Sequence, residues 1–390
     1  MIKYPYARPD LIKDDKDAVA KSLTGQFLTG GDIINKFESK ISAKFKVKNA
    51  VVCNSGTAAL HLIYTSLGLK EGDAILTSPI TFVATANAAR MCKAEVVFAD
   101  VDSNTGLLTA NTIERVLKVS KFKIKIITLV HLGGRLCELE AIAKVAKKYN
   151  CLIVEDACHA PGAIYYNSNK KTSKVGSCKY SIASSFSFHA IKHITMAEGG
   201  CVTTNNARLA KKIRCKLNHA MIKNKNGKFA DPWFYQINEL GWNYRASEIN
   251  CALGNSQLTR LNKLLKKRKE IALIYKKELN GIKSISFPKN SFKRNNNAWH
   301  LFTILIDFER LKIKKRDIVK KLEKKGIGTQ IHYIPIFLQP YYKHTYTNEF
   351  KGSMIYYEKN LSLPMYVSLK KKDIIYICET LKSILEKNEK

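Results

Sequence analysis

The chain has 390 residues, of which 45% are hydrophobic, and a formal net charge of +34. This length suits two domains, or one large α/β domain with an appendage, and no apolar run reaches the roughly 18 residues of a membrane span. The first six residues lack the apolar stretch of a signal peptide, so we expect a cytoplasmic protein without a membrane partner. Ten cysteines occur without a C-x-x-C pair, so no metal site is expected.

The strong positive charge invites a nucleic-acid partner. The lysines, however, are spread along predicted helices, as at 264–269 and 312–325, without a zinc-finger or RNA-binding motif. A solvated, lysine-rich surface explains this distribution better, and it would also attract a diphosphate substrate. We therefore expect no nucleic acid to bind, and we keep a basic nucleic-acid-binding protein as the alternative of a different class.

The N-terminal part predicts an arm and two helices over residues 1–45, around a glycine-rich loop at 22–31. A strand at 50–53 follows, and the turn at 54–57 leads into a helix closed by Gly68. The free N–H groups and the dipole of such a helix N-terminus can bind an anion. Taken alone, the pattern favours an ordinary capped helix.

Strand-like and helix-like segments then alternate. Strands are expected at 74–77, 95–98, 124–130 and 152–154, and helices at 82–90, 111–117 and 139–148. This alternation predicts a mainly parallel sheet covered on both faces, with ligands at the carboxyl ends of its strands. Phe82 is placed there either to stack on a flat ring or, more commonly, to fill the core. Asp156 also lies there, and a buried carboxylate needs a cationic partner.

The segment 184–200 reads SSFSFHAIKHITMAEGG. Its alternating small and aromatic residues predict a strand, and the glycine pair predicts a tight turn before a second strand at 201–204. Lys192 therefore lies on a loop between two strands, among apolar neighbours. Loss of hydration there would lower its pKa and make it a better amine nucleophile. Without this setting, one lysine in a lysine-rich chain would be only a surface charge.

From about residue 250 the pattern changes to that of a smaller α+β domain. A long helix is expected over 251–279, strands around 299–306, a helix near 318–325, and an edge strand with proline at 327–335. A polar loop is expected earlier, at 223–230. We therefore expect an N-terminal arm and large domain over 1–250, and an interdomain helix with a small domain over 251–390.

Several motifs together resemble the DegT/DnrJ/EryC1/StrS family of pyridoxal-phosphate sugar aminotransferases. The longest match is S-F-S-F-H-x-x-K with the following E-G-G, and others are S-G-T-x-A-L, E-D-A-C-H and N-Y-R-x-x-E-I. The resemblance covers nearly the whole chain. It implies fold type I, with a large domain on a mainly parallel sheet of the seven-stranded type and a smaller α+β C-terminal domain. It is tightest to the branch of pseudaminic acid synthesis, through P-I-x-F-V-A-T-A-N, N-x-W-H-L and H-Y-x-P-I.

The resemblance implies pyridoxal 5'-phosphate as cofactor, bound covalently by Lys192, which then serves as general acid/base. Residues implied around the cofactor are Gly56, Thr57, Phe82, Asp156, His159, Ser187 and Asn243. Among these, Asp156 would hold the pyridine nitrogen, whose protonation makes the ring an electron sink, and His159 would lie near the phenolic oxygen. Asn243 would reach the phosphate in the other subunit of a homodimer with shared active sites; from the residues alone it is a helix cap.

The resemblance also implies a substrate side. Its residues would be Tyr6, Gln26, Phe27, Leu28, Thr29, His332, Tyr333, Ile334 and Pro335. The implied reaction transfers the amino group of L-glutamate to C4 of a UDP-linked 4-keto-6-deoxy-N-acetyl sugar of the L-arabino series, giving UDP-4-amino-4,6-dideoxy-N-acetyl-β-L-altrosamine. A 4-amino-arabinose, bacillosamine or dTDP-fucosamine aminotransferase is the alternative on the same fold. The dehydratase branch of the family has histidine in place of this lysine, so Lys192 argues against it.

Overall fold

The computed structural model describes residues 2–223, 231–290, 295–342 and 350–390. Seven strands form its central sheet: β1 (Asn49–Cys53), β2 (Asp73–Thr77), β3 (Glu95–Phe98), β4 (Lys123–Val130), β5 (Leu152–Asp156), β8 (Ala183–Ser187) and β9 (Gly200–Thr204). Their order in space is β1-β9-β8-β5-β4-β2-β3. β9 runs antiparallel to β1 and β8, and the other neighbouring pairs are parallel. The predicted mainly parallel sheet is therefore confirmed.

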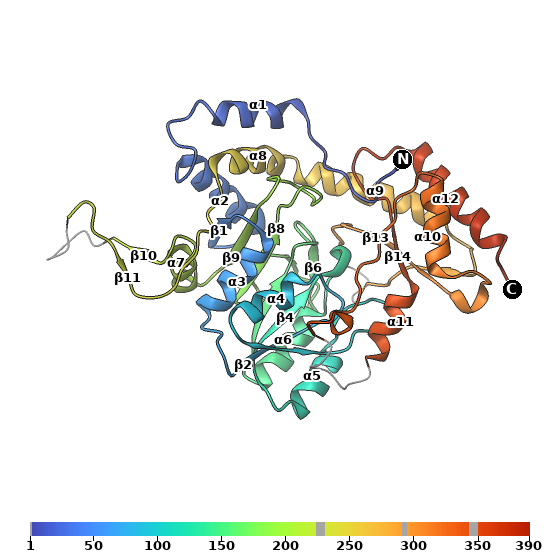
Figure 1. Cartoon of the computed structure of the whole chain (residues 1–390), viewed down its shortest axis with the longest axis horizontal. Helices are drawn as coiled ribbons and strands as arrows, with labels where there is room; N and C mark the ends of the chain where they lie inside the picture. The colour runs from blue at the N-terminus through green and yellow to red at the C-terminus, as the bar shows by residue number, and fades with distance from the viewer. Residues whose placement is uncertain (1, 224–230, 291–294, 343–349) are drawn as a thin grey trace.

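Helices cover both faces of this sheet (Figure 1). One face packs against α2 (Asp32–Phe45), α5 (Ala110–Val119) and α6 (Leu139–Lys148), and the other against α3 (Gly56–Ser66), α4 (Ala84–Met91) and α7 (Ala207–Lys216). Val52 belongs to the first core and its neighbour Val51 to the second, because successive side chains of a strand point to opposite faces. Because both faces are buried, the strands consist mainly of apolar and small residues, and β8 and β9 also bury serine and threonine side chains.

A third core surrounds a three-stranded antiparallel sheet in the C-terminal part. Its strands are β12 (Ile285–Ser286), β13 (Phe302–Ile306) and β14 (Asn360–Leu363), packed with α9 (Leu261–Glu278), α10 (Lys315–Lys324) and α12 (Lys371–Glu386). The N-terminal Tyr4 is buried in this core and pairs with Ile327. The N-terminal arm therefore packs against the core of the C-terminal part. The domain boundary at residue 250 stays a prediction.

Two expectations for the C-terminal part are wrong in detail. The helix expected over 251–279 is two helices, α8 (Glu248–Thr259) and α9. They are separated at Arg260, whose guanidinium binds the carboxylates of Asp10 and Asp15 on the arm and on α1 (Lys13–Ser22). The edge strand expected at 327–335 is an irregular segment with isolated bridges at Ile327 and Gln330.

The described elements also include two small ribbons, one further α-helix and short 3-10 helices at Leu132–Gly134, Phe308–Arg310 and Ile336–Leu338. β6 (Ile164–Tyr166) pairs with β7 (Thr172–Lys174), β10 (Met221–Ile222) pairs with β11 (Gln236–Ile237), and α11 is Lys351–Lys359. The ribbon of β10 and β11 projects from the body of the molecule (Figure 1). From residue 224 on, the polar loop predicted at 223–230 lies outside the described residues. Within the described ranges, no helix has the length and apolar character needed to cross a bilayer.

Candidate functional site

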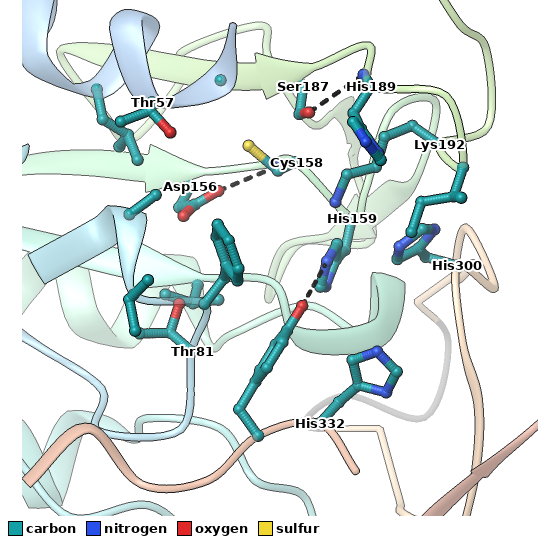
Figure 2. A pocket seen from close by; sticks show the side chains of 18 of the residues that line it. Thr57, Thr81, Asp156, Cys158, His159, Ser187, His189, Lys192, His300 and His332 are labelled. Carbon is teal, nitrogen blue, oxygen red and sulfur yellow. Dashed lines mark hydrogen bonds between the residues drawn. The ribbon is translucent and has the colours of Figure 1, made fainter. Parts of the chain in front are cut away.

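A cavity of about 640 Å³ lies at the carboxyl ends of β2, β5 and β8, around Lys192 (Figure 2). Most side chains singled out from the sequence line it: Tyr6, Gly56, Thr57, Phe82, Asp156, His159, Ser187, Lys192, His332, Tyr333 and Ile334. They come from the arm, from the large domain and from the segment after α10. The structure therefore brings widely separated motifs to the sheet edge that the strand pattern predicted.

Lys192 is half-buried on the loop between β8 and β9, where its N–H donates to the His189 carbonyl at 2.9 Å. Burial lowers the pKa of the Lys192 ammonium, and the nearby charge of Arg268 adds to this effect. The nearby Asp156 and Cys158 act in the opposite direction. The result is an amine that loses its proton more readily than a surface lysine and is thus a better nucleophile.

Asp156 ends β5 with a carboxylate that is 7% exposed. One oxygen accepts from the Thr85 hydroxyl at 2.7 Å, and the other accepts from the Cys158 N–H at 3.2 Å. The Thr85 hydroxyl in turn lies 2.9 Å from that of Thr81. These neutral donors fix the carboxylate but do not neutralise it, so a protonated ring nitrogen in the cavity would be a fitting partner.

His159 lines the cavity (Figure 2) and links the large domain to Tyr333 through a hydrogen bond. Its Nδ1 accepts from the Gly133 N–H at 3.2 Å, which places the proton of the neutral ring on Nε2. Nε2 then donates to the Tyr333 hydroxyl at 3.3 Å. Burial, followed by the charge of Lys192, holds the pKa of His159 well below its usual value. The hydroxyl proton of Tyr333 is therefore free to point at a ligand.

The N-terminus of α3 lies directly against Ser187 at the edge of the cavity. The Ser55 side chain caps the helix by accepting from the Ala58 N–H at 3.0 Å. A Cβ on Gly56 would lie 2.9 Å from the Ser187 Cβ, so glycine is needed for this approach. The hydroxyls of Thr57 and Ser187 line the cavity beside the first N–H groups of the helix, an arrangement that suits a phosphate.

The substrate residues expected near the N-terminus lie elsewhere in the single chain. Gln26 and Phe27 line a second hollow of about 820 Å³ with Glu248, whereas Leu28 and Thr29 are exposed on the same loop. Pro335 follows the cavity-lining Ile334 in the chain and is itself buried.

Asn243 also lies outside the Lys192 cavity. It is exposed, and its backbone pairs with Asn218. The helix-cap interpretation of Asn243 is wrong, because α8 is capped by Ser247, whose side chain accepts from the Asn250 N–H at 3.1 Å. Within one chain, Asn243 does not line the Lys192 cavity; its carbonyl accepts from the Asn54 side chain at 3.5 Å, one residue before the cavity-lining Ser55.

Some residues of the site were missed by sequence reasoning. Thr85 binds Asp156 from a position 71 residues earlier in the chain. His300, which is 4% exposed, lines the cavity and packs on His159 with ring centroids 4.2 Å apart. The segments P-I-x-F-V-A-T-A-N and N-x-W-H-L contain these two residues and were the available signals, but neither motif says which side chain faces the cavity.

A family model described as the DegT/DnrJ/EryC1/StrS aminotransferase family matches residues 9–382. The chain is 38% identical over 388 residues to the UDP-4-amino-4,6-dideoxy-N-acetyl-beta-L-altrosamine transaminase of Campylobacter jejuni serotype O:2, covering 99% of this chain and 98% of that protein. It superposes on Helicobacter pylori PseC, an aminotransferase involved in the biosynthesis of pseudoaminic acid, with a TM-score of 0.90 and 32% sequence identity. The superposition covers 98% of this chain and 99% of PseC. The PLP form of a putative sugar aminotransferase from Streptococcus pneumoniae superposes with a TM-score of 0.88 and is 26% identical in sequence. The superposition covers 98% of each chain.

Proposed function

Because the chain belongs to the DegT/DnrJ/EryC1/StrS aminotransferase family, we propose that it holds pyridoxal 5'-phosphate and transfers an amino group to a nucleotide-linked keto sugar. One observation carries this proposal. The readily deprotonated amine of Lys192, the fixed carboxylate of Asp156 and the anion-binding end of α3 line a single cavity. Each of the three is suited to a different part of that cofactor.

Each residue has a distinct task in this proposal. Thr57 and Ser187 hold the phosphate together with the N-terminus of α3, and Asp156 holds the ring nitrogen. The exposed ring of Phe82 offers a stacking surface. Lys192 moves protons to and from the carbon that gains or loses the amino group. When bound, the cofactor supplies the electron sink that stabilises negative charge at that carbon.

For the acceptor we propose a UDP-linked 4-keto-6-deoxy-N-acetyl sugar, with L-glutamate as amino donor. The support is the similarity to transaminases of C. jejuni at 38% and of H. pylori at 33% identity, both named for UDP-4-amino-4,6-dideoxy-N-acetyl-beta-L-altrosamine. A GDP-perosamine synthase is 30% identical, so another nucleotide sugar is the second candidate. The free hydroxyl proton of Tyr333 and the neutral ring of His332 offer hydrogen bonds to either sugar.

The test is turnover against a panel of UDP-, dTDP- and GDP-linked 4-keto sugars with L-glutamate, followed by NMR of the product. We expect the UDP-linked N-acetyl sugar to react with the highest kcat/KM and to gain an amino group at C4. A higher kcat/KM for a GDP- or dTDP-linked sugar would overturn the substrate. Absence of amination with every sugar, by protein that has bound the cofactor, would overturn the reaction.

We further propose a homodimer in which Asn243 of the partner subunit completes each active site. Large apolar side chains are exposed near the projecting ribbon, with exposed fractions of 75% for Trp233, 57% for Ile237 and 73% for Leu240. Apolar groups gathered in this way are typical of a surface that a partner covers, and a two-fold interface builds both sites at once. All ten cysteines are free, which suits the cytoplasmic location that we propose.

A further inference from the structure

Three buried histidines lie in a row behind Lys192: His193, His300 and His159, which we call the histidine stack. The ring centroids of His193 and His300 are 5.2 Å apart, and those of His300 and His159 are 4.2 Å apart with an interplanar angle of 32°. On its far side, His159 lies nearly parallel to the ring of Tyr333, at 19° and 6.2 Å. The stack therefore ends at the hydroxyl-bearing ring of Tyr333, which lines the cavity.

The backbone that carries His300 is tied to the large domain. The N–H groups of Ala298 and His300 donate to the carbonyls of Gly134 and Gly133, both at 3.1 Å. Between them, Trp299 has a φ of 53°. A non-glycine residue keeps this left-handed conformation only where its surroundings impose it, and such residues cluster at functional sites.

Two side chains fix the same turn from the other side. His193 donates from Nε2 to the Ala298 carbonyl at 2.9 Å. Arg268, only 2% exposed, donates to the carbonyls of Trp299 and His300 at 3.3 and 3.2 Å. Because these bonds lock the turn, the His300 ring has little freedom to move away from His159.

The charge around the stack opposes any further proton. The positive or titratable groups whose charge acts on His159 are Lys192, His332, His193 and Arg135, and the His300 ring and the Tyr333 hydroxyl contact it directly. Burial lowers the pKa of His300 and of His193 well below the usual value, and the charges of Lys192 and Arg268 add to this for both rings. A proton on Nδ1 of His159 would also face the Gly133 N–H, so the bond between them would be lost.

We propose that His300 is a positioning residue for His159. Its ring, carried by the turn that Arg268 and His193 hold, excludes water from one face of the His159 ring. His159 thereby stays neutral with its proton on Nε2, and Tyr333 keeps its own hydroxyl proton for the ligand. This inference rests on the proposed function only where it assigns Tyr333 to the substrate side; the effect of His300 on His159 belongs to the folded protein itself.

The experiment follows the nine histidines by NMR of their imidazole groups in the purified protein without substrate, in parallel with the pH profile of kcat. His300→Ala opens the stack to water, so the titration midpoint of His159 should rise by about one pH unit or more toward about 6.5. The ratio of kcat at pH 6 to kcat at pH 8 should fall about fivefold, because part of the His159 is then protonated. His300→Phe retains a flat ring and should keep the midpoint close to that of the wild type.

Leu301→Ala is the matched control, since this residue is the next in the chain and is also buried, at 5% exposure. It should lower the melting temperature without moving the His159 midpoint. If His300→Ala does not fold, His300→Gln replaces it, with a shift of the same sign. An unchanged His159 midpoint in the ring-less variant overturns the positioning role, as does an equal shift in Leu301→Ala. A shift of His159 in a protein that aminates no sugar would sustain this role while the proposed function fails.

Discussion

The Lys192 cavity and the surface that carries Asn243 and the 26–29 loop were assigned by one resemblance, yet the chain builds them differently. Side chains of the cavity, such as Asp156 and Lys192, are fixed at strand ends or on the loop between strands. Asn243 and Phe27 are instead exposed, Phe27 at 58%. In the proposed function, a single chain thus forms the half of the site that would hold the cofactor ring, and we expect a second copy to supply the other half.

The largest loss of activity is expected when Lys192, in the cavity half, is replaced. Lys192→Ala removes the amine and its proton transfers, so we expect transamination to fall by at least about a thousandfold. Lys267→Ala, on the exposed side of α9, is the control and should remain active. Borohydride reduction of the wild-type protein should attach the cofactor to the peptide that contains Lys192. Recovery of the adduct on a different lysine would refute the assignment.

Asp156→Asn tests the same half with a smaller expected loss. The amide can still accept from the Thr85 hydroxyl, but it cannot keep the ring nitrogen protonated. We expect cofactor binding to persist and kcat to fall about a hundredfold or more. Thr85→Val removes one hydrogen bond to the charged carboxylate and should cost about tenfold in kcat. Near-normal turnover of Asp156→Asn, measured with saturating cofactor, would mean that Asp156 has another role.

The surface half is tested by mixing two inactive variants, Lys192→Ala and Asn243→Ala, under conditions of subunit exchange. A hybrid dimer contains one site with both defects and one site with neither. Random exchange makes half of the dimers hybrid, so about a quarter of the wild-type activity should return. If Asn243→Ala alone weakens cofactor binding and the mixture recovers nothing, Asn243 acts within its own chain. A fully active monomer in sedimentation would end the shared-site proposal.

How well the sequence predicts this site depends on how far apart in the sequence the contacting residues lie. The places of Asp156 at a strand end and of Lys192 between two strands were predictable because the strand pattern shows where strands end, whereas Ser187 came from the resemblance alone. The bond from Thr85 to Asp156 and the packing of His300 on His159 join segments far apart in the chain. Local patterns carry no information about which distant partner a side chain meets. The break at Arg260 is of the same kind, since it is held by acids from the arm.

The smallest expected effect compares a histidine of the cavity half with a buried histidine of α3 that packs against the surface half. Burial lowers the pKa of His332 in the cavity to about 3, and that of His61, which packs on Trp242 beside Asn243, to about 4. Below about pH 6.5 these two histidines bind a proton in the unfolded chain but stay neutral in the folded protein. The free energy of unfolding therefore falls as the pH falls. Each ring should account for about 1 kcal/mol of unfolding free energy lost between pH 7 and pH 5.5.

His332→Phe and His61→Phe should therefore each flatten the acid side of the stability curve, measured by thermal unfolding from pH 7 to 5.5. The slope is the readout, because the lost hydrogen bonds, such as that of His61 with the Tyr244 hydroxyl at 3.1 Å, change stability at every pH alike. His219→Asn is the control: His219 is exposed with a φ of 58°, a conformation that asparagine tolerates. Its slope should match the wild type. The same slope can be measured with the anionic cofactor bound. If the cofactor flattens the slope of the wild type but not that of His332→Phe, its binding has raised the pKa of His332. The cavity half would then respond to its ligand.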